Sequence, residues 1–494
     1  MFSRLFNSPW FFFGLAALLI GVAVVSQFQR ADVEAPKGDI EEVLALKEGK
    51  PYNVVFILID TLRADRLSAY GYNRETSPNI DALAERGVRF ARVESQSSWT
   101  KASMASLWTG LYPQRTGVIR FPHALPGDAV MPAEVFQEAG YRTGGVWRNG
   151  WVANNFGFSQ GFDLYIRPTQ SRSREDIRRF APSSFALSGT DLDVTVSASE
   201  FVMGTSGNPF LLYLHYMDVH QYVYSDVSPD YGTDISDIYD SSIHWTDQNV
   251  GLVVEMLRAR GLLDDTWIII ASDHGEAFFE HGGEGHARNL YTEVQQVPLI
   301  IAPPVSLSPG LVVEQRVANV DIWPTVLDLL GLPPLPDAQG ESLVPLIEAA
   351  AGLREVPQDL VERPLFAQLD RSWGRATSDP DPMVSVMKND FKMLHRFSEP
   401  DHDELYDRSI DPREQENLAG SEEAIRADLA QEIDEFSKQG VVWNESFEVE
   451  IDEMNAAQLR ALGYVLPAAQ KDAEGAKPVA PAPAPAPRKV WGED

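Results

Sequence analysis

The feature that most constrains the fold is an apolar run over residues 52–59 that ends at an acid, Asp60. A run this rich in apolar and β-branched residues predicts a strand buried on both faces, as in the centre of a parallel sheet. Further strand-like runs lie at 211–216, 267–272 and 298–302, and helical stretches at 78–86, 131–139 and 244–260. The alternation predicts an α/β fold with a mainly parallel central sheet sandwiched by helices.

Polar side chains stand where two of these strands end. Asp60 closes the first strand, and Asp273 with His274 closes another, while Thr100 precedes a helical segment. In such sheets functional groups gather at the carboxyl ends of the strands. Two carboxylates, an imidazole and a hydroxyl can ligate a divalent cation, which would activate the hydroxyl for attack. The alternatives without a catalytic role are an N-cap for Thr100 and a hydrogen-bonded turn acid for Asp60.

The composition excludes two classes of chemistry. The chain has no cysteine, so disulfides, thiolate metal sites and a cysteine nucleophile are ruled out. Lys and Arg number 41 against 72 Asp and Glu, which gives a formal net charge of −31. Binding to nucleic acid needs clustered basic residues, so we expect no nucleic-acid partner.

The N-terminal part predicts a membrane attachment. Residues 10–25 are apolar and uncharged, and these 16 residues would span about 24 Å as a helix, slightly less than a typical hydrocarbon core. We interpret residues 1–30 as a membrane anchor, with a cleaved signal peptide as the alternative, and 31–51 as a tether. Either interpretation places the rest outside the cytoplasmic membrane, in the periplasm or at the cell surface.

The remaining sequence suggests a large domain followed by a smaller one. We expect a catalytic domain over 52–380 and a C-terminal α+β part over 381–465. The second part contains a hairpin pattern at 383–394 and an acidic helical pattern at 421–438. Residues 466–494 carry Pro-Ala repeats, which cannot build a core and predict a disordered tail.

A series of short motifs follows in order along residues 52–340. They lie at 53–60, 70–72, 77–81, 108–117, 157–163, 215–220, 272–276, 297–300 and 321–325. Together they resemble the sulfatase family of the alkaline-phosphatase-like superfamily, and residues 404–407 and 411–418 resemble its C-terminal part. The resemblance implies the same α/β architecture and a metal-dependent esterase.

The sequence departs from the family pattern at the nucleophile. Sulfatases of the formylglycine type carry Cys or Ser followed by x-Pro-x-Arg, whereas this chain has Thr100, Ala102 and Met104 at these positions. Threonine cannot be oxidised to the catalytic aldehyde by that route. The family's second adjacent acid is Thr61 here. What remains is similar to the metal set of threonine-dependent relatives, which include phosphodiesterases and phosphoglycerol or phosphoethanolamine transferases: Asp60, Thr100, Asp273 and His274.

The resemblance also implies roles for other residues. Thr100 would form a covalent intermediate, and His220 would protonate the leaving group. Lys101, Asn149 and His286 would contact the substrate anion. A plain loop histidine is the alternative for His220, a solvated lysine for Lys101, and a ligand of a second metal for His286. The donor set favours zinc or manganese, and it suits calcium or magnesium less well.

Three functions follow as hypotheses. The first is a metal-dependent hydrolase or transferase of phosphate esters, acting on a small or a lipid- or glycan-linked anionic ester. The second is a sulfatase that acts without formylglycine. The third is a catalytically silent surface-binding protein, which the intact set of metal-ligand and nucleophile residues argues against.

Overall fold

The computed structural model describes residues 36–449 apart from 170–175, 181–188, 206, 375–377 and 444. The predicted anchor over residues 1–30 and the predicted tail over 466–494 therefore lie outside the described residues. Within the described part of the chain, no helix combines the length and the apolarity needed to cross a bilayer.

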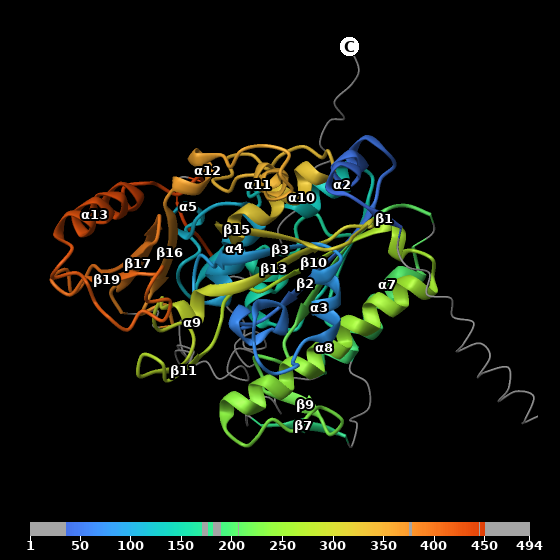
Figure 1. Cartoon of the computed structure of the whole chain (residues 1–494), viewed down its shortest axis with the longest axis horizontal. Helices are drawn as coiled ribbons and strands as arrows, with labels where there is room; N and C mark the ends of the chain where they lie inside the picture. Colours follow the sequence, from blue (N-terminus) through green and yellow to red (C-terminus); the bar gives the residue numbers. More distant parts are fainter. Residues whose placement is uncertain are drawn as a thin grey trace, which may run out of the picture.

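A central sheet carries the fold (Figure 1). In the described residues it has eight strands in the order β15-β3-β13-β10-β2-β8-β5-β6. Their bounds are β2 (Asn53–Ile59), β3 (Val88–Glu94), β5 (Arg142–Val146), β6 (Leu164–Ile166), β8 (Phe210–Tyr216), β10 (Thr266–Ala271), β13 (Gln296–Ala302) and β15 (Leu311–Ala318). Strands β10, β2, β8, β5 and β6 run parallel, as do β15 and β3. The predicted mainly parallel sheet is confirmed, although β13 runs antiparallel to both of its neighbours.

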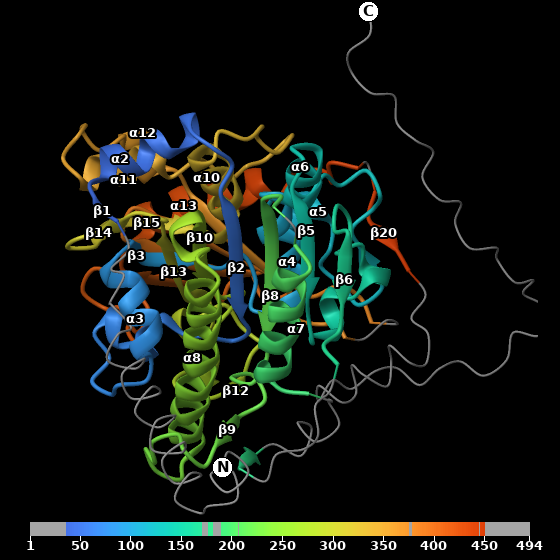
Figure 2. The same ribbon diagram turned by 90° about the vertical axis from the view of Figure 1, so that its right-hand side faces the viewer.

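Helices cover both faces of this sheet (Figures 1 and 2). One layer consists of α3 (Pro78–Glu85), α7 (Asp191–Met203) and α8 (Ile235–Ala259), and the other includes α4 (Thr100–Thr109), α6 (Pro132–Glu138), α10 (Ile322–Leu329) and α11 (Val344–Ala350). Helix α3 begins with Pro78 at its first position, where the missing N–H costs nothing. Helix α8 starts well before the predicted 244, because a capping box between Asp234 and Asp237 opens it.

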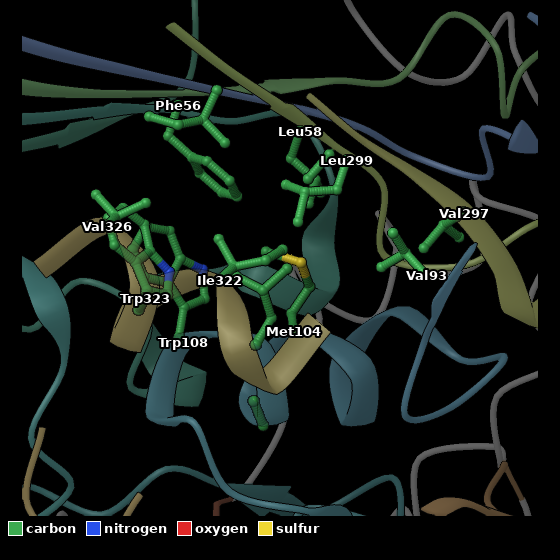
Figure 3. Close-up of a cluster of buried hydrophobic side chains, with 14 of the residues drawn as sticks. Phe56, Leu58, Val93, Met104, Trp108, Val297, Leu299, Ile322, Trp323 and Val326 are labelled. Carbon is green, nitrogen blue, oxygen red and sulfur yellow. The ribbon is translucent and has the colours of Figure 1, made fainter. Parts of the chain in front are cut away.

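Aromatic packing fixes α4 against the sheet (Figure 3). Trp108 of α4 stacks on Trp323 of α10 with ring centres 5.0 Å apart. Phe56 of β2 meets both indoles, at 5.7 Å from Trp108 and 5.0 Å from Trp323. Such pairs add about 0.5–1.5 kcal/mol each beyond the burial of their area. Gly110 ends α4 in the left-handed region, with φ of 68°, and its N–H donates to the backbone oxygen of Ser106.

A smaller antiparallel sheet follows at the C-terminal side. It consists of β16 (Leu365–Asp370), β17 (Pro382–Lys388), β18 (Phe391–Arg396) and β19 (Glu404–Asp407), in that order, with α13 (Glu423–Ser437) packed on β17 and β18. The predicted hairpin and acidic helix are confirmed. The sheet takes its first strand, β16, from before residue 381, where the sequence suggested the boundary.

Short elements complete the described chain. Two-residue or three-residue strands pair as β1 (Lys37–Gly38) with β14 (Ser306–Leu307), β4 (His123–Ala124) with β20 (Phe447–Glu448), β7 (Ile177–Arg179) with β9 (Val223–Ser225), and β11 (Ala277–Phe278) with β12 (Glu284–Gly285). Short helices are α2 (Ile40–Ala45), α5 (Pro113–Thr116), α9 (Thr292–Gln295) and α12 (Gln358–Glu362).

Candidate active site

Four neighbouring parallel strands deliver the predicted site residues to one edge of the sheet. Asp60 directly follows β2, and Asp273 lies two residues after β10. Asn149 lies three residues after β5, and His220 four residues after β8. Thr100 is the first residue of α4 and is fully buried. The carboxyl ends of β10, β2, β8 and β5 thus bring together residues that are up to about 200 positions apart in the sequence.

Asp60 is held through one of its two carboxylate oxygens. Asn149 Nδ2 donates to Asp60 Oδ2 at 2.6 Å, and His215 Nε2 lies 2.9 Å from the same oxygen. Since an ionised carboxylate only accepts, His215 carries its proton on Nε2 and accepts the Tyr213 phenol at Nδ1, at 2.6 Å. The other oxygen, Asp60 Oδ1, is buried and has no partner in the described residues. This relay leaves one oxygen of Asp60 free to bind a cation.

Thr100 contacts His274, another of the candidate metal ligands. Its Oγ1 lies 3.1 Å from His274 Nε2 and 3.4 Å from Asn149 Nδ2. Because the carbonyl of Gly275, 3.0 Å from His274 Nδ1, can only accept, the proton of the neutral ring sits on Nδ1. His274 Nε2 therefore presents a lone pair to the Thr100 hydroxyl. Ser103 of the same helix donates to the backbone oxygen of Asp273 at 2.6 Å, which ties α4 to the end of β10.

Three of the four predicted metal ligands form a cluster that fits a divalent cation, and ligation by the fourth, Thr100, stays a prediction. Ligand atoms of Asp60, Asp273 and His274 all lie within 4.8 Å of one another. Asp273 Oδ2, like Asp60 Oδ1, is buried without a hydrogen-bond partner in the described residues. Burial opposes ionisation of Asp60, but the hydrogen bond from His215 holds its pKa below the usual value, while burial and the Asp60 charge raise the pKa of Asp273. Burying two carboxylates whose oxygens lack partners costs free energy, and a bound cation would offset that cost.

Two more predicted histidines lie beside this centre. The His286 ring lies 4.6 Å from the His274 ring and 4.9 Å from the His220 ring. His286 Nδ1 contacts Glu276 at 3.2 Å, and Glu276 outweighs the effect of burial and raises the pKa of His286. Burial lowers the pKa of His220 to about 4, and both of its ring nitrogens are buried without a partner in the described chain. A neutral His220 at pH 7 offers one N–H donor and one lone pair.

The side chain of Lys101 binds backbone oxygens of the segment that follows α5. Its Nζ donates to the backbone oxygens of Phe121 and His123 at 2.6 and 2.7 Å, and it lies 4.0 Å from the centre of the Phe156 ring. The side chain is fully buried, and burial lowers its pKa well below the usual value. These contacts hold the start of α4. A contact between Lys101 and a substrate stays a prediction.

Two further histidines of the described chain, His281 and His215, hold neighbouring residues in place. His281 Nδ1 contacts Glu293 at 2.9 Å, so His281 anchors a loop. His215 received no role from the sequence, yet it orients Asp60. Its signal was the pair of polar side chains at Tyr213 and His215, which share one face of an otherwise apolar strand.

Three of the seven non-glycine residues with left-handed φ angles in the described chain lie next to site residues. Thr61, Tyr222 and Ala287 adopt left-handed φ angles of 61°, 51° and 58°. Each lies within two residues of a site residue: Asp60, His220 and His286 respectively. Non-glycine residues in this region cost about 1–3 kcal/mol and persist where the surroundings over-determine them, which is frequent at functional sites.

The family model described as Sulfatase matches residues 52–332, more than half of the chain. The chain belongs to the sulfatase family. A second model, for the C-terminal part of N-sulphoglucosamine sulphohydrolase, matches residues 280–439 of this sulfatase-family chain. The predicted family is therefore confirmed.

Individual relatives of this sulfatase-family chain are distant. It is 24% identical to N-acetylglucosamine-6-O-sulfatase of Bacteroides thetaiotaomicron, over 80% of this chain and 87% of the relative. A solved 2-O GAG sulfatase superposes with a TM-score of 0.64 at 20% identity, covering 84% of this chain and 96% of that one. A phosphonate monoester hydrolase of Agrobacterium radiobacter superposes with a TM-score of 0.62 at 20% identity, covering 78% and 95%. The solved structures show a shared fold.

The relatives correct the order of our hypotheses. We expected phosphate esters first and sulfate esters second. The matched family models and the named sequence relative concern sulfatases, so sulfate ester hydrolysis is the better-supported alternative.

Proposed function

We propose that this protein is a metal-dependent sulfatase that hydrolyses a sulfate ester with Thr100 as its unmodified nucleophile. The observation that carries the proposal is the position of Thr100 Oγ1, 3.1 Å from His274 Nε2 at the start of α4. Asp60 and Asp273 lie beside it as buried carboxylates with free oxygens. A hydroxyl at a helix start also faces backbone N–H groups that suit an anion.

The residues divide the reaction between them. Asp60, Asp273 and His274 would hold a divalent cation, which when bound supplies positive charge that favours loss of the Thr100 proton and offsets charge on the sulfate. Attack forms a bond from Thr100 Oγ1 to sulfur and breaks the bond from sulfur to the bridging oxygen. Thr100 loses one proton and the leaving oxygen gains one. His220, which is neutral at pH 7, would take up a proton on its free ring nitrogen and pass it to the leaving oxygen, so that the two changes balance. Water then cleaves the Thr100 sulfate ester, releases sulfate and restores the hydroxyl.

The charge of the site favours sulfate over phosphate monoesters. A sulfate monoester carries a single negative charge, whereas a phosphate monoester carries about −1.5 to −2 at neutral pH. The position that holds Arg in formylglycine sulfatases is Met104, which is buried in the core. Lys101 donates to backbone carbonyls. A site with few cationic side chains is better matched to the smaller charge of a sulfate.

The substrate that we propose is a sulfated sugar. This inference rests on the names of the relatives, an N-acetylglucosamine-6-O-sulfatase and a GAG sulfatase. Asn149, whose Nδ2 lies 3.4 Å from Thr100 Oγ1, and His286, whose ring lies 4.6 Å from that of His274, would contact the sulfate oxygens. We further propose that residues 1–30 keep the enzyme outside the cytoplasmic membrane. Protease digestion of the domain in cells with a permeabilised outer layer would support this, and protection would contradict it.

A substrate panel tests the function. Purified enzyme is assayed with an aryl sulfate, glucosamine 6-sulfate, an aryl phosphate monoester and an aryl phosphodiester, each with zinc and with manganese. We expect the sulfate esters to have the higher kcat/KM, and high-resolution mass spectrometry of a quenched reaction to find sulfate on Thr100. Faster turnover of a phosphate ester would restore our first hypothesis. Metal binding without turnover of any ester would favour a silent binding protein.

A further inference from the structure

Arg148 is buried next to Asn149 in the sequence and connects its own segment to two others. Its side chain is 2% exposed, although it carries a full charge. Nη1 donates to Asp218 at 2.6 Å and to Asp191 at 3.0 Å. Nη2 donates to the backbone oxygen of Gly189 at 2.8 Å and to Gln221 Oε1 at 3.2 Å. One guanidinium therefore joins the end of β5 to the start of α7 and to the loop after β8.

The two carboxylates are themselves fixed. Asp218 Oδ2 accepts from the Trp245 indole and from the backbone N–H of Asp191, both at 2.8 Å. Asp191 accepts from the backbone N–H of Met217 at 2.7 Å and from the Thr246 hydroxyl at 2.8 Å. Burial alone would lower the pKa of Arg148, but Asp218 and Asp191 raise it, so the arginine stays charged. The result is a closed network between β5, β8, α7 and α8.

This network borders two residues of the reaction. Arg148 immediately precedes Asn149, whose Nδ2 reaches Asp60 Oδ2 at 2.6 Å. Asp218 and Gln221 flank His220 on both sides along the chain. His220 has no hydrogen-bond partner of its own in the described residues, so its loop backbone and its ring contact with His286 hold its direction. Anything that moves Asp218 and Gln221 moves His220.

We propose that Arg148 is a positioning residue, which sets the placement of Asn149 and His220 together through its contacts with Asp218 and Gln221. The inference rests on the proposed function for the roles of these two residues. The four hydrogen bonds described above for the Arg148 guanidinium go to neither the nucleophile nor the candidate metal ligands. A planar guanidinium with donors on both nitrogens can hold two loops in register, whereas an ammonium acts from a single point.

Kinetics of three variants test the inference. In Arg148→Met we expect kcat to fall about 100-fold, because displacing a catalytic group by about 1 Å has effects of that size. KM should change less than about threefold, and Arg148→Lys should recover about tenfold in kcat. The matched control is Arg363→Met, which removes another largely buried arginine, ion-paired to the fully buried Asp321. Its kcat, measured well below its melting temperature, should equal that of the wild type.

A mutant cycle distinguishes a positioning role of Arg148 from general destabilisation of the fold. If Arg148 acts through Asn149 and His220, Arg148→Met should cost less than about threefold in kcat when both are already alanine. A full 100-fold loss in that background would overturn the inference. If Arg148→Met does not fold, the same cycle is run with Gln221→Ala, which leaves no charge unpaired; for it we expect about a tenfold loss alone and none in the double-alanine background.

A measurement without turnover keeps the inference independent of the proposed function. The histidine Cε1–Hε1 resonances of the full chain are recorded for wild type, Arg148→Lys and Arg363→Met, with His220→Ala to assign the His220 signal. We expect the His220 resonance to shift in Arg148→Lys and to stay in place in Arg363→Met. An unchanged His220 resonance would overturn the inference. Absence of ester turnover in the wild type would contradict only the proposed function.

Discussion

The phenol oxygen of Tyr213 lies 2.6 Å from Nδ1 of His215, two residues further along the same buried strand. The other nitrogen of His215 reaches Asp60 Oδ2 at 2.9 Å. A hydrogen bond in the core of the sheet therefore determines which oxygen of Asp60 remains free for a cation.

Replacing Tyr213 tests this relay. Tyr213→Phe leaves His215 Nδ1 buried without a donor, which should lower the free energy of unfolding by about 1–3 kcal/mol. Metal affinity, measured by calorimetric titration, should weaken by about 10–100-fold because Asp60 loses its orientation. Tyr165→Phe is the control, since it removes a comparable phenol bond, to Val152 O at 2.7 Å, away from Asp60. Equal metal affinity in both variants would contradict the relay.

The nucleophile assignment predicts a large effect at Thr100. Thr100→Ala should lower kcat by at least about 10³-fold, because a nucleophile cannot be replaced by its neighbours. Thr100→Ser keeps the hydroxyl and should retain measurable turnover, with sulfate found on residue 100. Thr109→Ala, at the other end of α4, removes a hydroxyl bonded to Ala105 O and should keep near-normal kcat. Undiminished activity in Thr100→Ala would rule out the assignment.

The metal site predicts losses of both metal and stability. Asp273→Asn should lose bound metal in elemental analysis, because a neutral amide replaces one of the two carboxylates. Chelation of the wild type should lower the melting temperature, since a ligand at 100 times its Kd stabilises by about 2.7 kcal/mol. Asp247→Asn is the control, because Asp247 only accepts from the start of α3. Full metal retention by Asp273→Asn would count against the site.

The raised pKa of His281 predicts that the stability of the fold depends on pH. Burial lowers its pKa, but Glu293 and the Glu414 carbonyl outweigh this and raise it to about 8. The stabilisation is complete below pH of about 6.5 and is lost as the pH rises through about 8. With allowance for solvent screening we expect about 1 kcal/mol. Urea unfolding from pH 6 to 9 should show this loss in the wild type and a flatter profile in His281→Gln.

The exposed His402 supplies the comparison for that experiment. His402→Gln should keep the wild-type pH profile. If His281→Gln loses stability between pH 6.5 and 8 as steeply as the wild type, the titrating group is not His281.

Strands β2, β8, β10 and β13 of the central sheet were predicted, because apolar runs are local properties, whereas β3, β5, β6 and β15 of the same sheet were not. The direction of β13 was not predicted either, since it depends on the neighbouring strands β10 and β3. The convergence of Asp60, Asp273 and His274 followed from a parallel sheet, whose strand ends share one edge. Lys101 shows that proximity in sequence to a site residue does not place a side chain in the site. It is next to Thr100 in sequence, but successive helical residues point about 100° apart, and its side chain enters the core.

The amino-acid sequence alone determined the chemical identities: no cysteine, a threonine at the nucleophile position, and two acids and a histidine at strand ends. These follow from which atoms the side chains possess. The tertiary structure alone decided which oxygen of Asp60 is free, which nitrogen of His274 faces Thr100, and that Arg148 reaches Asp218 across 70 residues. Those are properties of hydrogen-bond partners brought together from distant strands, and no local pattern of residues contains them.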